Sequence, residues 1–172
     1  MRGWVIGLCA LVAGSAQAKA PSSPSLAALS GEVTVVAFWA TWCAPCRHEL
    51  PMVEALQQHL AGDARVRVVA VSVDDARDAA KARRLAGALG LTAPLLVDQA
   101  LYVRLFGGRD LSVPRLAVVD RRFAGLERDG ALANEASEAF VREVSAAVES
   151  VKTGTARPPS PLWHPYRRGP PR

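Results

Sequence analysis

The stretch that decides the fold reads Val33-Thr34-Val35-Val36-Ala37-Phe38-Trp39-Ala40-Thr41-Trp42-Cys43-Ala44-Pro45-Cys46. Its first six residues are mostly β-branched or aromatic, which predicts a buried strand. Beyond the quoted stretch, a helix is predicted over 49–60, because apolar side chains recur there at helical spacing, namely Leu50, Val53, Leu56 and Leu60. The two cysteines are therefore expected on the turn between a strand and a helix.

Two cysteines separated by two residues at such a turn form a reactive dithiol. If Cys43 directly precedes the first helical turn, unpaired N–H groups and the positive end of the helix dipole stabilise its thiolate. Thiols in such motifs have pKa values of about 3.5 to 7, against about 8.5 for an ordinary cysteine. We therefore predict that Cys43 is the nucleophile, and that the less exposed Cys46 resolves the mixed disulfide and forms a redox-active Cys43–Cys46 disulfide.

The cysteine pair has two alternative interpretations. A structural zinc site needs four ligands, but the sequence has no second cysteine pair, and His48, His59 and His164 do not fit a finger-like spacing. No metal ligand set is therefore predicted. An inert structural disulfide is the other alternative, but closing so short a loop constrains the unfolded chain little.

Residues 38–47, together with Glu49-Leu50-Pro51, resemble the active-site segment of thioredoxin-like proteins, specifically the extracytoplasmic thiol-disulfide oxidoreductases of the TlpA and ResA kind. Pro51 falls where that family kinks its active-site helix, although a simple helix break is the alternative. The resemblance implies an α/β, thioredoxin-like fold. It has a central mixed β-sheet flanked by helices and a strand-helix insertion of the TlpA/ResA type, and needs no cofactor.

The rest of the chain alternates strands with helices, as that fold requires. Further strands are predicted at 65–73, 95–97 and 116–119, with a hairpin turn and a fifth strand within 121–133. Helices are predicted from Asp74 or Asp75 to about Leu89, at 100–106, and after a capping Asn134. The domain boundaries are a signal peptide at 1–18, a linker at 19–30, the thioredoxin-like domain at 31–153, and a disordered Pro/Arg-rich tail at 154–172.

Val113-Pro114 precedes the strand at 116–119. In the resemblance, this is where a cis proline packs beside the dithiol and offers backbone hydrogen bonds to a bound peptide. An ordinary trans proline at the start of a strand is the alternative. Reductases of this family often have Thr at the position of Val113, whereas a Val there resembles some oxidases. The direction of electron flow therefore stays open. Trp42 is expected to contact substrates, its alternative being a core-packed ring.

Cys46 needs a group that accepts its proton, and we expect a nearby carboxylate to do so. Cytosolic thioredoxins have a buried aspartate at the position of Ala37, so that subclass is not favoured. By resemblance, Asp75, near the end of the strand at 65–73, takes this part, since a carboxylate in a dry site can accept and return the thiol proton. A helix-capping role for Asp75 is the alternative. Arg47 and His48 flank the helix start and are expected at the surface.

The N-terminal residues have the pattern of a signal peptide. Basic Arg2 precedes an apolar core over 4–12, and Ala16-Gln17-Ala18 is a small-residue cleavage pattern. The apolar core is shorter than the roughly 20 residues of a membrane-spanning helix. Cleavage before Lys19 would remove Cys9 and leave two cysteines. Lipidation of Cys9 and an uncleaved N-terminal anchor are the alternatives.

The formal net charge of +5 is confined to the ends of the chain. All 16 acidic residues lie within 19–156, where they balance 16 of the 21 basic residues. Because the body has no basic excess, a nucleic-acid partner is not predicted. The tail is expected to be an inert appendage, or to contact anionic lipid or a partner through Trp163, Tyr166 and its arginines.

Together these features predict a monomeric, periplasmic or otherwise extracytoplasmic protein-disulfide reductase that receives electrons from a membrane partner. Its expected substrates are protein disulfides, with apocytochrome c (hence a role in cytochrome c maturation) or a metal-site assembly protein implied by resemblance. The alternatives are a DsbA-like oxidant and a copper-handling module that uses Cys43, Cys46 and a histidine.

Overall fold

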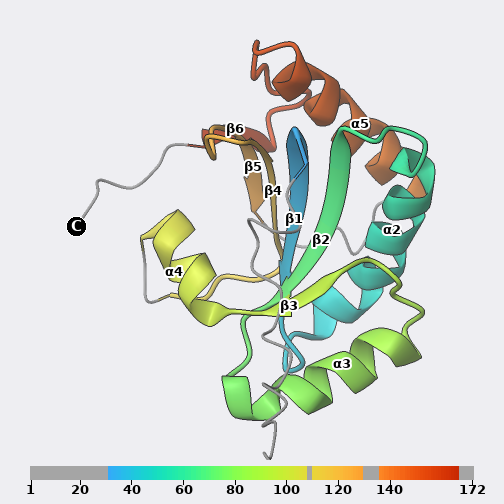
Figure 1. Ribbon diagram of the computed structural model, residues 1–172, viewed down its shortest axis with the longest axis vertical. Coiled ribbons are helices and arrows are strands. Elements are labelled where there is room, and N and C mark those ends of the chain that lie inside the picture. The colour runs from blue at the N-terminus through green and yellow to red at the C-terminus, as the bar shows by residue number, and fades with distance from the viewer. Residues whose placement is uncertain (1–30, 108–109, 130–135, 167–172) are drawn as a thin grey trace, which may run out of the picture.

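The computed structural model describes residues 31–107, 110–129 and 136–166. The predicted signal peptide at 1–18, the linker at 19–30 and the capping Asn134 lie outside these ranges. None of the helices within them has both the length and the apolar composition of a membrane-crossing segment. A central sheet with helices on both sides organises the described residues (Figure 1).

One six-stranded mixed sheet, in the order β3-β2-β1-β4-β5-β6, forms the centre of the described part of the chain. Its strands are β1 (Val33–Trp39), β2 (Val66–Ser72), β3 (Leu95–Val97), β4 (Arg115–Asp120), β5 (Gly125–Asp129) and β6 (Trp163–Tyr166). The β1, β2 and β3 strands run parallel, whereas β4 pairs with β1 in the antiparallel sense. Every residue of β1 is buried, because this strand has a neighbour on each side and helices over both faces.

Helices lie on both faces of the sheet (Figure 1). The helical elements are α2 (Ala44–Leu60), the 3-10 turn η1 (Ala76–Asp78), α3 (Ala79–Ala88), α4 (Gln99–Phe106) and α5 (Ser137–Lys152). The α2 and α5 helices pack together on one face, where Phe140, Val144, Val148 and Val151 are buried. The α4 helix lies on the opposite face, and α3 lies beside the β3 end of the sheet. The predicted strand-helix alternation and mixed sheet are thus confirmed.

Glycine ends two of the helices where the chain must enter the left-handed region. Gly90, two residues beyond α3, has a φ of 80°, and Gly107 has a φ of 71°. Gly107 is the C-cap of α4, and its N–H donates to the Val103 carbonyl. These turns direct the chain from α3 towards β3 and from α4 towards the loop that precedes β4.

A buried carboxylate fixes the middle of α2. Glu54 accepts hydrogen bonds from the backbone N–H of Thr92 (2.6 Å) and from its hydroxyl (2.6 Å), as well as from Ala93 N–H and Gln58 Nε2. Burial raises the pKa of Glu54, but these hydrogen bonds outweigh that effect, and the net pKa lies below the ordinary 4.5. The charged carboxylate therefore ties α2 to the segment that leads into β3.

The prediction of a disordered tail over 154–172 is wrong for its first part. Residues 163–166 form β6, which pairs antiparallel with β5. Trp163 is 2% exposed on the face covered by α5, and Tyr166 is 6% exposed against the core beside α4. Both aromatic rings are buried, so the proposed lipid contact through them is also wrong. The folded unit extends past residue 153 to Tyr166, because two large aromatic side chains supply apolar area that the Pro/Arg-rich composition conceals.

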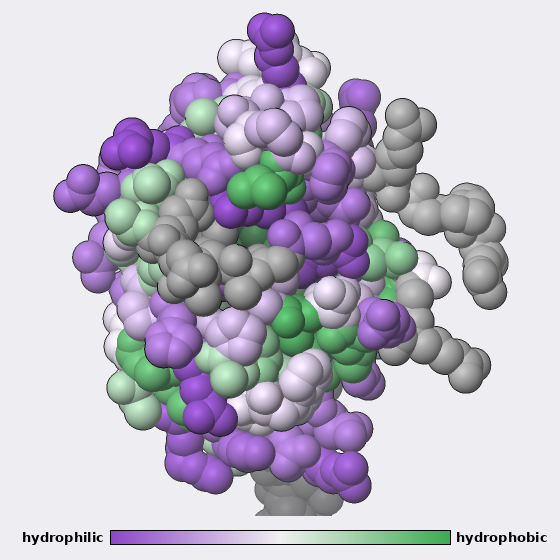
Figure 2. Space-filling view, turned by 180° about the vertical axis from the view of Figure 1, so that it is seen from behind, coloured by the Kyte–Doolittle hydropathy of each residue, from purple (hydrophilic) through white to green (hydrophobic). Residues whose placement is uncertain are grey.

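The face of the molecule drawn in Figure 2 is mainly hydrophilic. Figure 2 shows small hydrophobic patches separated by hydrophilic side chains on the side opposite to that of Figure 1. Among the described residues, the exposed large hydrophobic side chains are Trp42, Val103 and Leu162. Trp42 has the greatest exposure of the three and lies directly beside the cysteine pair.

Candidate active site

The cysteine pair lies where β1 passes into α2. Cys43 and Cys46 form a disulfide with their Cα atoms 5.3 Å apart. Cys43 is the N-cap residue of α2, and the backbone N–H of Cys46 donates to Cys43 Sγ at 3.2 Å. The predicted turn between strand and helix is therefore confirmed. Both cysteines are buried in the disulfide form, Cys43 at 4% exposure and Cys46 completely.

This position favours a thiolate on Cys43 once the disulfide is reduced. The first turn of α2 contains no acidic residue that could offset the positive end of the helix dipole. The Cys46 N–H that now contacts Cys43 Sγ is one of the donors that a helix leaves unpaired at its N-terminus. Hydrogen bonding to the charged form and the dipole both act to lower the pKa of a thiol placed there.

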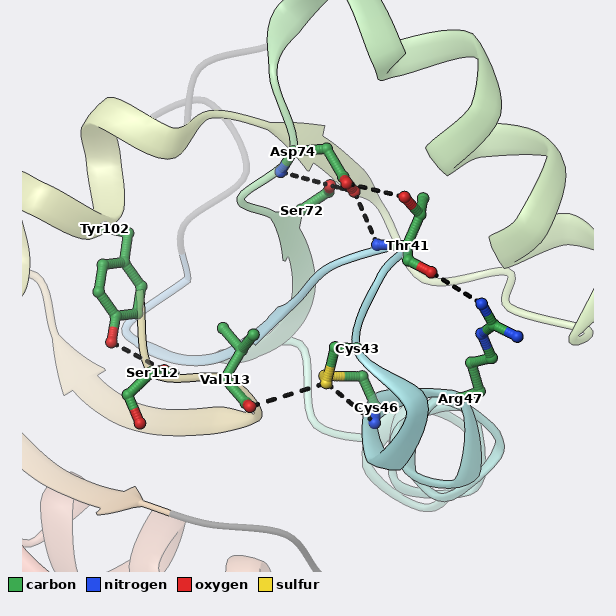
Figure 3. Close-up of a disulfide and its surroundings, with 9 residues drawn as sticks. All are labelled: Thr41, Cys43, Cys46, Arg47, Ser72, Asp74, Tyr102, Ser112 and Val113. Atoms are coloured by element: carbon green, nitrogen blue, oxygen red, sulfur yellow. Dashed lines mark hydrogen bonds between the residues drawn. A yellow bond between two sulfur atoms is a disulfide. The ribbon is translucent and has the colours of Figure 1, made fainter. Parts of the chain in front are cut away.

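A second group of polar side chains contacts the turn between β1 and α2 (Figure 3). Asp74, which is 5% exposed, accepts hydrogen bonds from Thr41 N–H (2.9 Å), Thr41 Oγ1 (2.8 Å) and Ser72 Oγ (2.6 Å). On the other side of the turn, Arg47 donates to the Thr41 carbonyl at 3.0 Å. Thr41, two residues before Cys43, is therefore held at its N–H, its hydroxyl and its carbonyl.

The predicted role of Asp75 is not supported by its position. Its side chain is 61% exposed and its carboxylate pairs with Arg77 at the surface. Asp75 is the N-cap residue of η1, as the capping alternative predicted, but its side chain makes no capping hydrogen bond. The neighbouring Asp74 is the buried carboxylate of this segment. Side chains alternate along β2 and its extension, and Asp74 is on the same side as Ser72, which directs it inward.

The Val113–Pro114 peptide bond is cis, as the resemblance implied. The Val113 carbonyl oxygen lies 3.7 Å from Cys43 Sγ, so residues far apart in the sequence meet at the disulfide (Figure 3). In the reduced protein, the Cys43 thiol can donate to this oxygen. Cys43, Cys46, Val113 and Pro114 therefore belong to one site.

Trp42 is 58% exposed, which contradicts the core-packed alternative. Its ring is available to a partner that approaches Cys43. Ala37, by contrast, is buried under α2 and α5 and offers no ionisable group. Arg47 and His48 are exposed, as expected.

Metal ligands do not gather in the described part of the chain, where no group of three or more His, Cys, Asp and Glu side chains could hold an ion. An open surface hollow of about 390 Å³ lies between α2 and α5. It is lined by Ala55, His59, Ser137, Glu138, Val141 and Arg142. None of the predicted site residues lines it.

The sequence interpretation missed Asp74 and its partner Thr41. The signal available for Asp74 was its spacing from Ser72 at the end of an otherwise apolar strand, which places both side chains on one face. For Thr41 the only signal was its position two residues before Cys43. Nothing in the sequence paired the two residues, which are separated by 33 positions.

Part of this chain is similar in sequence to known proteins. Thioredoxin-like protein YneN of Bacillus subtilis (strain 168) is 41% identical over 76 residues, which are 44% of each chain. Thiol:disulfide interchange protein CycY of Rhizobium leguminosarum bv. viciae is 39% identical over 77 residues, 44% of this chain and 38% of CycY. The thiol-disulfide oxidoreductase ResA of Oceanobacillus iheyensis is 40% identical over 53 residues, 31% of this chain and 27% of ResA. These alignments span less than half of each relative, and they confirm the resemblance to the ResA kind.

Solved structures share the fold. StoA from Bacillus subtilis superposes with a TM-score of 0.53 at 21% identity over 66% of this chain and 82% of StoA. MTB DsbF, in its mixed oxidized and reduced forms, gives a TM-score of 0.53 at 26% identity over 69% of this chain and 83% of DsbF. The fold is thus thioredoxin-like, as predicted. The model of one family, Redoxin, matches residues 12–150, which include both cysteines and most of the sheet, and the chain therefore belongs to the Redoxin family.

Proposed function

We propose that this protein is a thiol-disulfide oxidoreductase that reduces protein disulfides outside the cytoplasm. The observation that carries the proposal is the Cys43–Cys46 disulfide at the N-terminus of α2, where the Cys46 N–H contacts Cys43 Sγ at 3.2 Å. Sequence similarity to thiol:disulfide interchange protein CycY and to thiol-disulfide oxidoreductase ResA supports the same chemistry.

The reaction uses the two sulfurs in sequence. In the reduced protein, the Cys43 thiolate attacks one sulfur of a substrate disulfide, and the other substrate sulfur leaves as a thiolate and takes up a proton. Cys46 then loses its proton and attacks Cys43 Sγ, which releases the substrate's second thiol. Two electrons pass to the substrate, and the Cys43–Cys46 disulfide is formed. A dithiol donor, which we propose to be a membrane protein, restores the reduced state by the reverse exchange.

The geometry supports a different role for each cysteine. Cys43 accepts from the Cys46 N–H, keeps 4% exposure and lies beside exposed Trp42, so we assign the attack on a substrate to it. Cys46 is fully buried and can react only with a sulfur already joined to Cys43. The peptide backbone around Val113 is the proposed contact for a substrate segment, with Trp42 beside it.

The place of action is proposed from the sequence. The basic residue, apolar core and small-residue pattern over residues 1–18 support export, and cleavage before Lys19 would leave Cys43 and Cys46 as the remaining cysteines. N-terminal sequencing of the protein recovered from the extracytoplasmic fraction tests this part. Apocytochrome c or a metal-site assembly protein is the substrate class that the TlpA/ResA resemblance implies.

Two experiments test the proposal. Equilibration of the Cys43–Cys46 pair with a glutathione or dithiothreitol buffer gives the redox potential, which we expect near or below the roughly −270 mV of thioredoxin. A value near −120 mV would instead identify an oxidant of the DsbA kind, for which Val113 is the specific observation.

The substrate is identified by trapping. Cys46→Ala leaves Cys43 able to attack but removes the resolving thiol, so the mixed disulfide accumulates and the attached protein can be sequenced. Cys43→Ala is the matched control and should trap little, because buried Cys46 cannot reach a substrate. Titration of the reduced protein with Cu(I) tests the copper-handling alternative, which predicts a tight stoichiometric complex with loss of thiol reactivity.

A further inference from the structure

One buried tyrosine joins α4 to both sides of the Val113–Pro114 segment. Tyr102, in the middle of α4, is fully buried. Its hydroxyl donates to the Ser112 carbonyl at 2.8 Å and accepts from Arg115 Nη1 at 3.1 Å. Ser112 and Arg115 are the residues directly before Val113 and directly after Pro114. A single hydroxyl therefore fixes the backbone on one side of the pair and a side chain on the other.

The Arg115 end of this link is itself held in place. Its guanidinium lies over the Phe106 ring, 3.9 Å from the centroid, and donates to Asp129 Oδ2 at 2.9 Å. Arg115 therefore contacts α4 through an aromatic ring and β5 through a carboxylate. Because both contacts fix the guanidinium, it is a rigid donor to Tyr102, and the tyrosine hydroxyl keeps one orientation.

The segment that Tyr102 holds contacts the reactive sulfur. The Val113 carbonyl, one residue from the Ser112 carbonyl, lies 3.7 Å from Cys43 Sγ (Figure 3). A carbonyl oxygen accepts a hydrogen bond from a neutral thiol but repels a thiolate, so its distance from the sulfur affects the balance between the two forms. Burial raises the pKa of Tyr102, which keeps the hydroxyl protonated and able to donate.

We propose that Tyr102 is a positioning residue for Cys43: through Ser112 and Arg115 it sets the distance between the Val113 carbonyl and the reactive sulfur, and β6 keeps the helix that carries Tyr102 in place. This inference rests on the proposed function in one respect, namely that Cys43 is the attacking thiol. Tyr102 does not contact the substrate or the sulfur, so it acts only through the segment that it holds.

The strand β6 supplies the outer link. The Tyr166 hydroxyl donates to the Leu105 carbonyl of α4 at 2.8 Å, and its ring packs edge-on against Phe106 with centroids 5.8 Å apart. Tyr102 in turn packs edge-on against Phe38 of β1, with centroids 5.3 Å apart. On the other face of the same strand, Trp163 Nε1 donates to Glu143 of α5. Tyr166 is therefore connected to the active site, whereas Trp163 stabilises the opposite face.

The test measures the pH dependence of alkylation of Cys43 by iodoacetamide in the reduced protein. Tyr102→Phe keeps the ring and its packing but removes both hydrogen bonds. We expect the pKa of Cys43 to fall by about half a unit, because the thiol loses a well-placed acceptor while the Cys46 N–H still stabilises the thiolate. Tyr166→Phe is expected to shift the pKa in the same direction by less.

Trp163→Phe is the matched control, since it removes a hydrogen bond from the same strand on the far face. It should lower the unfolding midpoint and leave the Cys43 pKa unchanged. The proposal is overturned if Tyr102→Phe leaves the pKa at the wild-type value, or if Trp163→Phe shifts it equally. Should Tyr102→Phe fail to fold, the comparison of Tyr166→Phe with Trp163→Phe decides, and equal pKa values in those two variants overturn the proposal.

The alkylation assay needs no substrate and does not depend on the direction of electron flow. A redox potential near that of an oxidant would overturn the reductase proposal and leave the role of Tyr102 intact. An unchanged pKa in Tyr102→Phe would overturn the role of Tyr102 and leave the oxidoreductase proposal intact.

Discussion

Asp74 and Glu54 are two buried carboxylates with similar hydrogen bonds and different relations to the dithiol. Asp74 accepts from Thr41 N–H, Thr41 Oγ1 and Ser72 Oγ, and so fixes the turn that precedes Cys43. Glu54 accepts from Thr92, Ala93 and Gln58, and so fixes the middle of α2 to the segment before β3. The contribution of a buried acid to function therefore depends on which backbone segment it holds, and not on its burial alone.

The largest effect is expected from Asp74→Ala. It leaves the Thr41 N–H buried without its acceptor and should lower the free energy of unfolding by about 3 kcal/mol. The turn that positions Cys43 also loosens, so we expect reduction of a disulfide substrate to slow by about tenfold. Urea unfolding and steady-state kinetics measure the two effects. Asp74→Asn keeps the shape and one acceptor oxygen, and should show smaller losses in both. A normal rate in a destabilised Asp74→Ala protein would show that Asp74 contributes to stability but not to the reaction.

A smaller effect, on stability alone, is expected from Glu54→Ala. The loss of acceptors for Thr92 and Ala93 should lower the free energy of unfolding by about 2 kcal/mol. Because this carboxylate does not contact the turn before Cys43, the rate of Cys43 alkylation should stay within about twofold of the wild type. If the alkylation rate falls as far as in Asp74→Ala, the two carboxylates are not functionally distinct.

The pH dependence of the free energy of unfolding tests the role of Glu54. Its pKa in the folded protein is below the ordinary 4.5, so the folded state favours the charged carboxylate. The resulting stabilisation is fully present above about pH 5 and is lost as the pH falls below about 4.5 and through the folded-state pKa. Urea unfolding at several pH values should show that the difference in free energy of unfolding between wild type and Glu54→Gln becomes smaller as the pH falls. A gap that is constant or widens at low pH contradicts this assignment.

The smallest effect is expected from Asp75→Asn. This exposed carboxylate pairs only with surface Arg77 among the contacts described, and surface pairs of this kind contribute little. Stability and the pH profile of the exchange reaction should both match the wild type. A displaced pH profile would restore the proton-relay role that the position of Asp75 contradicts.

The fold could be predicted from sequence wherever the apolar pattern was continuous. The strands at β1, β2, β3 and β4 and the helices between them follow from runs of β-branched residues and from helical spacing, and the structure has them within a few residues. The reactive turn was predictable for the same reason, since the cysteines follow a clear strand and precede a clear helix.

What sequence could not predict depends on long-range contacts. The strand β6 is four residues long within a Pro/Arg-rich stretch, and its formation depends on a partner in β5 and on pockets for Trp163 and Tyr166. Asp74 and Asp75 are adjacent and chemically identical, so only the direction of the backbone distinguishes the buried carboxylate from the exposed one. The link from Tyr102 to Ser112 likewise requires that α4 and the loop before β4 be placed in space.

The position of Cys43 at the N-terminus of α2 is expected to make it the attacking thiolate. The most direct measurement is the pH-dependent alkylation of the reduced protein, with the modified cysteine identified by mass spectrometry. We predict that Cys43 is modified first, with an apparent pKa of about 7 or below, and that Cys46 stays largely unmodified at the same pH. Modification of Cys46 first, or a Cys43 pKa near the ordinary value of about 8.5, would show that Cys43 is not the attacking thiolate.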